Sequence, residues 1–233
     1  MRPLEILPVE GLPEVRPGDR IAALLAAAGA DLRDGDVVVV TQKIVSKAEG
    51  RMVAVDPDDP AARAAVIERE SVRILRRRGE LVISETASVF VCANAGVDRS
   101  NVPDGFVTLL PVDSDRSARR IRDGLANVPG VDVGVIVSDT FGRTWRNGVT
   151  DVAIGCAGIA AVVDLRGTTD GMGRALEVTE VAVADELAAA AELVMGKATG
   201  IAAAIVRGLD PAWFRPSSVR AEIVRAPGED LFR

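Results

Sequence analysis

Short apolar runs separated by glycine, proline and charged residues dominate the hydrophobic pattern of this chain. The most continuous run, Val37–Thr41 (VVVVT), is typical of a strand that is buried on both faces of a sheet. Similar runs predict further strands over Leu4–Val9, Leu81–Ser84, Val89–Ala93, Phe106–Leu110, Val131–Val137, Ile159–Leu165 and Ala202–Val206. Strands are therefore expected along the whole length of the chain.

Apolar residues with helical spacing occur between these strands. Asp19 is positioned to cap a helix that Gly29 ends, with apolar residues 21, 24, 25 and 28 on one face. Further helices are predicted over Pro60–Arg77, from Ser114 or Asp115 onward, and over Glu177–Gly196. The basic stretch Arg73–Arg78 (RILRRR) then falls at a helix end, where cations suit the helix dipole. Because helices and strands are mixed, we expect an α+β fold, with residues 1–233 forming a single domain.

The composition limits the chemistry that the chain can perform. Hydrophobic residues make up 48% of the sequence, but there is no tyrosine and no histidine. The absence of histidine excludes a Ser-His-Asp or Cys-His nucleophile and a histidine-ligated zinc site. Cys92 and Cys156 lie in small-residue or apolar runs, so we expect buried, reduced thiols. Proton transfer would have to use carboxylates, lysine, cysteine or water.

The charge and the hydropathy of the chain argue against nucleic-acid and membrane partners. The formal net charge is -6, and an acidic chain without a basic cluster is a poor ligand for nucleic acid. No stretch approaches the roughly 18 consecutive apolar residues of a membrane span. The N-terminal residues lack the apolar region of a signal peptide. We therefore expect a soluble, cytoplasmic protein.

Polar residues follow an apolar run in the loop Gly96–Asn101 (GVDRSN). This loop offers Asp98, Ser100 and Asn101, and their oxygen atoms are of the hard type that Mg²⁺ or Mn²⁺ prefers. The same spacing also suits an ordinary Asx turn. The residues alone leave both interpretations open.

A second polar segment, Ser138–Asp151 (SDTFGRTWRNGVTD), follows the predicted strand Val131–Val137. Asp139 and Thr140 place a carboxylate beside a hydroxyl, which suits a metal ion. Arg143 and Arg146 suit phosphate or carboxylate groups. The alternative is a surface loop with local ion pairs.

The third polar segment, Thr41–Gly50 (TQKIVSKAEG), follows the strongest predicted strand. Lys43 and Lys47 are four residues apart and share a face on a helical turn, where either could hold a nucleotide phosphate. The alternative is a pair of solvent-exposed lysines. The chain contains no GxxxxGK[ST] loop and no GxGxxG after a strand, so any nucleotide site must be of a less familiar kind.

Taken together, these segments resemble the coenzyme F420-0:L-glutamate ligase family, the gamma-glutamyl ligases of the deazaflavin coenzyme. The most diagnostic stretch is SDTFGRTWRNG followed by TD and AIGCAG. The others are ILPVEGLPEVRPGD, DGDVVVVTQKIVSKAEGR, ANAGVDRSNV, LLPVD and VTEVAVADELAAAAELVMGK. They run in order from Ile6 to Lys197 and so cover most of the chain.

The resemblance implies an unusual α+β fold in an intertwined homodimer, and a GTP-dependent amide synthesis. The phospholactyl carboxylate of the precursor, coenzyme F420-0, would be phosphorylated to an acyl phosphate, from which the amine of L-glutamate displaces phosphate. Mg²⁺ or Mn²⁺ is implied as the metal, with K⁺ as a further candidate. The resemblance assigns Asp98, Asp139 and Thr140 to the metal, and Asp98, Asp139, Arg143 and Arg146 to catalysis. It assigns Leu12, Pro13, Glu14, Val15, Gln42, Lys47 and Asn101 to the nucleotide.

Two positions depart from the family pattern. Val149 stands where the family usually has glutamine, and Lys197 stands near a position where many members have a glutamine that helps to bind a second metal. A protonated lysine cannot be a metal ligand, so Lys197 could instead hold a phosphate. Asp151 and Glu85 both remain candidates for the base that accepts the proton of the glutamate amine.

Two alternatives to a ligase follow from the same residues. A metal-dependent phosphohydrolase or phosphotransferase would use the same aspartates and arginines without an amine substrate. A non-catalytic nucleotide-binding protein would keep the fold, but the presence of Asp98, Asn101, Asp139 and Thr140 argues against it.

Overall fold

The computed structural model describes residues 3–127 and 129–231, and its centre is a five-stranded mixed sheet. In spatial order the strands are β1 (Glu5–Pro8), β12 (Ala203–Arg207), β2 (Val37–Thr41), β8 (Gly134–Arg143) and β9 (Arg146–Ala157). The neighbours β2 and β8 are parallel, whereas the other neighbouring pairs are antiparallel. The parallel pair brings the carboxyl ends of β2 and β8 to the same edge of the sheet.

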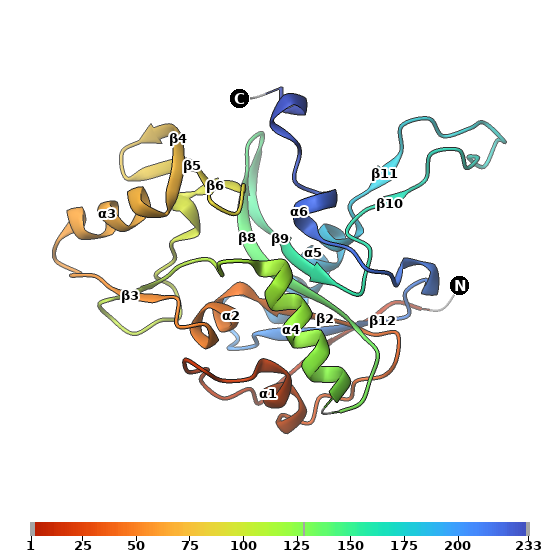
Figure 1. Cartoon of the computed structure of the whole chain (residues 1–233), viewed down its shortest axis with the longest axis horizontal. Coiled ribbons are helices and arrows are strands. Elements are labelled where there is room, and N and C mark those ends of the chain that lie inside the picture. Colours follow the sequence, from red (N-terminus) through yellow and green to blue (C-terminus); the bar gives the residue numbers. More distant parts are fainter. Residues whose placement is uncertain (1–2, 128, 232–233) are drawn as a thin grey trace.

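Helices cover both faces of this sheet (Figure 1). Residues of α1 (Ile21–Ala27), α2 (Gln42–Ala48) and α4 (Ser114–Asn127) pack on one face, and those of α5 (Val183–Met195) and α6 (Val219–Glu222) on the other. Val38 and Val40 belong to the first layer and Val37 and Val39 to the second, because successive side chains of a strand point to opposite faces. All four valines are fully buried, which explains a run of four strand residues without a polar position.

Residues 52–108 form a smaller unit beside the main sheet, which we call the side lobe (Figure 1). It contains β3 (Met52–Ala54), α3 (Pro60–Glu70), β4 (Ser71–Arg78), β5 (Leu81–Thr86), β6 (Val91–Ala93), the 3-10 turn Asn94–Gly96 and β7 (Phe106–Thr108). Strand β3 pairs with β7, and β4, β5 and β6 form a second small sheet. The side lobe has its own apolar cluster, which includes Ile67 and Val82.

The remaining elements lie after β9. Strands β10 (Val163–Asp164) and β11 (Glu180–Val181) pair at the base of a projecting arm (Figure 1). The 3-10 turns Pro211–Trp213 and Pro227–Glu229 flank α6. None of the helices in the described part has the length and apolar character needed to span a bilayer. The mixture of small and large sheets with helices confirms the predicted α+β class.

The predicted helix Pro60–Arg77 is wrong in its second half. Helix α3 ends at Glu70, and the basic stretch lies on strand β4, which pairs with β5. The helix ends where the Ser71 hydroxyl donates to the Ile67 carbonyl at 2.6 Å, and β-branched residues follow. Arg73 pairs across the strands with Glu85 at 3.1 Å. Pairing with β5 therefore decides the conformation of the basic stretch.

Other boundaries differ as well. The segment Ser138–Asp151 is not a loop but the distal part of the β8–β9 hairpin. The segment Ile159–Leu165 is a strand only at β10, and the predicted helix Glu177–Gly196 begins at α5 after β11. Arg20, not Asp19, occupies the cap position of α1, because the Asp19 carboxylate accepts the Arg16 N–H at 2.7 Å. Both cysteines are buried and free, as predicted.

Candidate functional site

The carboxyl ends of β2 and β8 lie next to each other, with Thr41 paired to Ser138. The sequence places Gln42 and Asp139 directly after these two positions. Residues 96–103 of the side lobe, together with residues 12–15 and 200–202, contribute to the lining of a cavity of about 1270 Å³, which we call the main cavity. Ligands of folds with parallel strands commonly bind at such strand ends.

Most of the predicted site residues line the main cavity. They are Leu12, Pro13, Glu14, Val15, Gln42, Lys47, Asp98, Asn101, Asp139 and Thr140. Arg143 and Arg146 do not line it, because both are exposed at the distal end of the β8–β9 hairpin. The Arg143 guanidinium donates to the Asn147 carbonyl at 2.6 Å. The structure thus brings the metal and nucleotide candidates together and leaves the two arginines outside.

Asp98 is held by a lysine and a serine. Lys43 Nζ lies 2.8 Å from Asp98 Oδ2 and donates to Ser100 Oγ at 2.5 Å. The Ser100 backbone N–H and hydroxyl donate to the same carboxylate at 2.8 and 2.9 Å. Burial opposes ionisation of Asp98, but the bonds from Lys43 and Ser100 outweigh it and lower its pKa. Asp98 therefore forms the Asx turn and also presents a charged, paired carboxylate to the cavity.

Asp139 has the most perturbed carboxyl group of the main cavity. Burial raises the pKa of Asp139 to about 7, although the Thr140 N–H lowers it, and the charges of Asp98 and Asp151 raise it further. Carboxylates that share a site repel one another unless a cation lies among them. Asp139 therefore marks the point where an added cation would be most favourable.

A lysine sits beside the third carboxylate of this group. Asp151 is 2% exposed and accepts the hydroxyls of Ser138 and Thr140 at 3.0 and 2.7 Å. Lys197 Nζ lies 2.8 Å from Asp151 and 2.8 Å from Glu192, and it also donates to Thr140 Oγ1. Burial lowers the pKa of Lys197, but its bonds to the two carboxylates raise it overall. Lys197 therefore places a fixed positive charge of the protein at this end of the cavity.

The nucleotide candidates on α2 face the cavity rather than solvent. Lys47 is 6% exposed and pairs with Glu14, and the side chain of Lys43 is 17% exposed. The alternative of two solvent-exposed lysines is therefore wrong. Gln42 is also buried: its Oε1 accepts the Ser46 hydroxyl at 2.8 Å, while its Nε2 has no partner among the described residues. A buried amide donor of this kind calls for an acceptor from a ligand.

The predicted metal ligands supply a small set of hard oxygen atoms. Over residues 3–127 and 129–231, no group of three or more His, Cys, Asp or Glu is arranged to hold a metal ion. Asp98 and Asp139 provide carboxylates, whereas the Thr140 hydroxyl is bonded to Asp151 and Lys197. This set fits Mg²⁺, which commonly binds through one or two carboxylates and completes its shell with water and substrate phosphates. The assignment of these ligands stays a prediction.

Several residues of the main cavity were missed by the sequence reasoning. Arg63, Glu80, Arg99 and Glu192 all line it. Arg63 and Glu192 lie within helices, and Glu80 lies in the β4–β5 turn. Arg99 lies in the polar loop Gly96–Asn101, but no polar run or strand end marks the other three positions in the sequence, so only the fold shows that the four residues meet.

The fold and the cavity define a class: α+β proteins in which carboxylates and lysines gather in a cavity at the end of a mixed sheet. Residues 11–208 match the family described as F420-0:Gamma-glutamyl ligase, and the chain belongs to this family. It is 46% identical to the coenzyme F420:L-glutamate ligase of Methanopyrus kandleri, with 99% of this chain and 98% of that protein covered. The proteins of the same name from Methanothermobacter thermautotrophicus and Archaeoglobus fulgidus are 43% and 40% identical, over 99% of this chain and 99% and 96% of their own lengths.

Proposed function

We propose that this protein joins L-glutamate to coenzyme F420-0 in a reaction that consumes GTP and requires Mg²⁺ or Mn²⁺. The names of its relatives support the ligation of glutamate to the deazaflavin coenzyme. The observation that carries the GTP and metal part is the gathering of Asp98, Asp139, Lys43, Lys47 and Gln42 in one cavity. A cavity of about 1270 Å³ has room for a nucleotide together with part of a second substrate.

The first step is the transfer of a phosphoryl group. A carboxylate oxygen of the acceptor attacks the γ-phosphorus of GTP, the new O–P bond forms, and the bond to the leaving GDP breaks. Positioning and neutralisation of charge are the main requirements of such a transfer. Lys43 and Lys47 supply fixed positive charge, and the free Nε2 of Gln42 can donate to the nucleotide. Asp98 and Asp139 would hold a divalent cation, which neutralises phosphate charge when bound.

The second step forms the amide bond. The nitrogen of glutamate attacks the acyl carbon, and the C–O bond to phosphate breaks. The amine must lose a proton, and the sequence left Asp151 and Glu85 as candidates for its acceptor. Asp151 lines the main cavity, whereas Glu85 pairs with Arg73 across the β4–β5 ladder. We therefore favour Asp151 as the acceptor of this proton. Lys197 lies beside it, where its ammonium group can stabilise the negative charge of the departing phosphate.

We also propose that the protein acts as an intertwined homodimer. Arg143 and Arg146 lie at the exposed end of the β8–β9 hairpin, outside the cavity of their own chain. An intertwined dimer would let this hairpin reach the cavity of a partner subunit. Light scattering coupled to gel filtration tests the dimer, and a monomer that is fully active would contradict it.

A reconstitution with single omissions tests the proposed reaction. The protein is incubated with GTP, Mn²⁺, L-glutamate and coenzyme F420-0, and the product is weighed by mass spectrometry while GDP is measured. We expect a product heavier by one glutamate residue, and GDP release that depends on both acceptor and glutamate. GTP hydrolysis at the same rate without either would favour the phosphohydrolase alternative. Nucleotide binding without any turnover would favour the non-catalytic one.

A further inference from the structure

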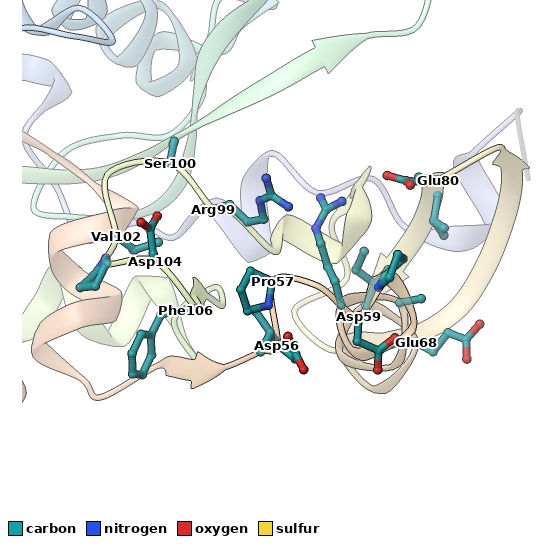
Figure 2. A pocket seen from close by; sticks show the side chains of 18 of the residues that line it. Asp56, Pro57, Asp59, Glu68, Glu80, Arg99, Ser100, Val102, Asp104 and Phe106 are labelled. Atoms are coloured by element: carbon teal, nitrogen blue, oxygen red, sulfur yellow. The ribbon is translucent and has the colours of Figure 1, made fainter.

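A second cavity lies in the side lobe (Figure 2). It shares part of its lining with the main cavity. Its volume is about 670 Å³, and we call it the lobe cavity. Figure 2 shows the loop with Arg99 and Ser100 along one side of it, and Asp59 and Glu68 across from them. Residues that line both cavities are Arg63, Glu80, Arg99, Ser100, Val102 and Pro103. A ligand in the lobe cavity can therefore extend into the main cavity along this shared wall.

The shared wall carries two arginines, the half-buried Arg63 and the exposed Arg99. Arg63 Nε is buried and donates to no acceptor among the described residues, and neither arginine forms an ion pair within them, although Glu80 lies in the same wall. Arg77, which also lines the lobe cavity, differs because it pairs with Glu68 at 2.8 Å. A buried donor without an acceptor costs free energy, so an acceptor from a ligand is expected. The planar guanidinium group suits phosphate and carboxylate.

The lobe cavity combines apolar surface with carboxylate side chains, those of Asp56, Asp59, Glu68, Glu80 and Asp104. Ile67 and Val82 are 3% and 4% exposed and belong to the core of the side lobe. Phe106, 39% exposed, and Pro57 stand at the rim. Cavities of this size with apolar surface and placed polar groups commonly bind small organic molecules. The apolar surface suits a ring system, and the two unpaired arginines of the shared wall suit an anionic group of the same ligand.

We propose that the lobe cavity binds the acceptor of the ligation, with its ring system on Ile67 and Val82 and its phosphate on Arg63 and Arg99. This proposal rests on the proposed function, which supplies an acceptor made of a deazaflavin, a phosphate and a terminal carboxylate. Ser100 lies on the shared wall and accepts a hydrogen bond from Lys43. The terminal carboxylate of the acceptor therefore extends past Ser100 to the lysine and the carboxylates of the main cavity.

Calorimetric titration of the full-length protein with coenzyme F420-0 tests this assignment. We expect Arg63→Met and Arg99→Met each to weaken F420-0 binding by about tenfold or more, because each loses a charge-assisted contact. Arg76→Met is the matched control, because Arg76 is an exposed arginine of β4 that lines neither cavity, and it should bind F420-0 as the parent protein does. Thermal unfolding midpoints close to that of the parent protein show that all three variants are folded.

Two results would overturn the assignment while leaving the ligase reaction intact. One is parent-like F420-0 affinity in both Arg63→Met and Arg99→Met. The other is a raised KM for glutamate with unchanged F420-0 affinity in these variants, which would indicate that the lobe cavity binds glutamate instead. A parent protein that binds F420-0 but forms no product would refute the proposed function alone.

Discussion

Replacement of Lys197 by methionine tests whether its ammonium group is the cation that neutralises Asp151 and Glu192. The change keeps an unbranched side chain and removes the charge that lies 2.8 Å from both Asp151 and Glu192. Asp151 is 2% exposed, so it would keep only the hydroxyls of Ser138 and Thr140. Removing one partner of a fully buried ion pair costs about 3–5 kcal/mol. Because the Lys197 side chain is 52% exposed and water can replace it, we expect about 1–3 kcal/mol.

The assay is urea unfolding at pH 7 in the presence of EDTA. Arg166→Met is the matched control, since Arg166 also contacts two carboxylates, Asp164 at 2.7 Å and Glu180 at 3.2 Å, but all three side chains are about half exposed. Exposed pairs contribute at most about 1 kcal/mol, so this control should unfold close to the parent protein.

Mn²⁺ provides the second arm of the same experiment. Without Lys197, the carboxylates of Asp151 and Glu192 lack a cation, so Mn²⁺ should bind the folded variant and raise its stability by mass action. The gain should be larger in the Lys197→Met variant than in the parent protein. If the variant is as stable as the parent protein in EDTA, or if Mn²⁺ stabilises both equally, Lys197 does not act as the local cation.

Three further changes test other parts of the structure. The pKa of Asp139 is raised from 3.8 to about 7 in the folded state. Between about pH 4 and 7 the folded metal-free protein therefore holds a proton on Asp139 that the unfolded chain has lost, and the stability of the fold should fall as pH rises through this range. Asp139→Asn should remove that part of the pH dependence in urea titrations, and an unchanged profile would contradict it. Gly155→Ala would place Cβ 2.3 Å from the Ser114 carbonyl carbon and should lower stability by about 3 kcal/mol or more in thermal unfolding. Gly142→Ala, with open space around it, is its control. Lys47→Ala should weaken GTP binding by about 1.5–3 kcal/mol in calorimetry; equal affinity would remove Lys47 from the nucleotide site.

The strands and the polar segments that follow them were predictable because they depend on local patterns. Four consecutive valines require burial on both faces, and β2 has it. Asp98 and Asp139 were recognised as candidates because each follows an apolar run, and both line the main cavity. The nucleotide candidates came from the family resemblance, not from the pattern. Their position in one cavity agrees with that resemblance but does not test their roles.

The errors occur where tertiary pairing overrides local preference. The basic residues of Arg73–Arg78 are typical of the C-terminal end of a helix, yet pairing with β5 holds this segment in a strand. Glycine, arginine and asparagine in Ser138–Asp151 suggest a loop, yet β8 and β9 pair almost to the turn. No local pattern could show that Arg63 of α3 and Arg99 of a distant loop share a wall, because that depends on how the side lobe folds.

The charges of the main cavity are the basis for proposing a cation at its centre. Asp98 is paired with Lys43, and Asp151 with Lys197. The charges of both carboxylates raise the pKa of Asp139. Among the described residues, only the Thr140 N–H and the charge of Lys43 act in the opposite direction. The raised pKa of Asp139 means that a proton neutralises it in the metal-free protein below about pH 7. A divalent cation would replace that proton, so metal affinity should rise with pH across the same range, and phosphate oxygens could then approach a site that is otherwise acidic.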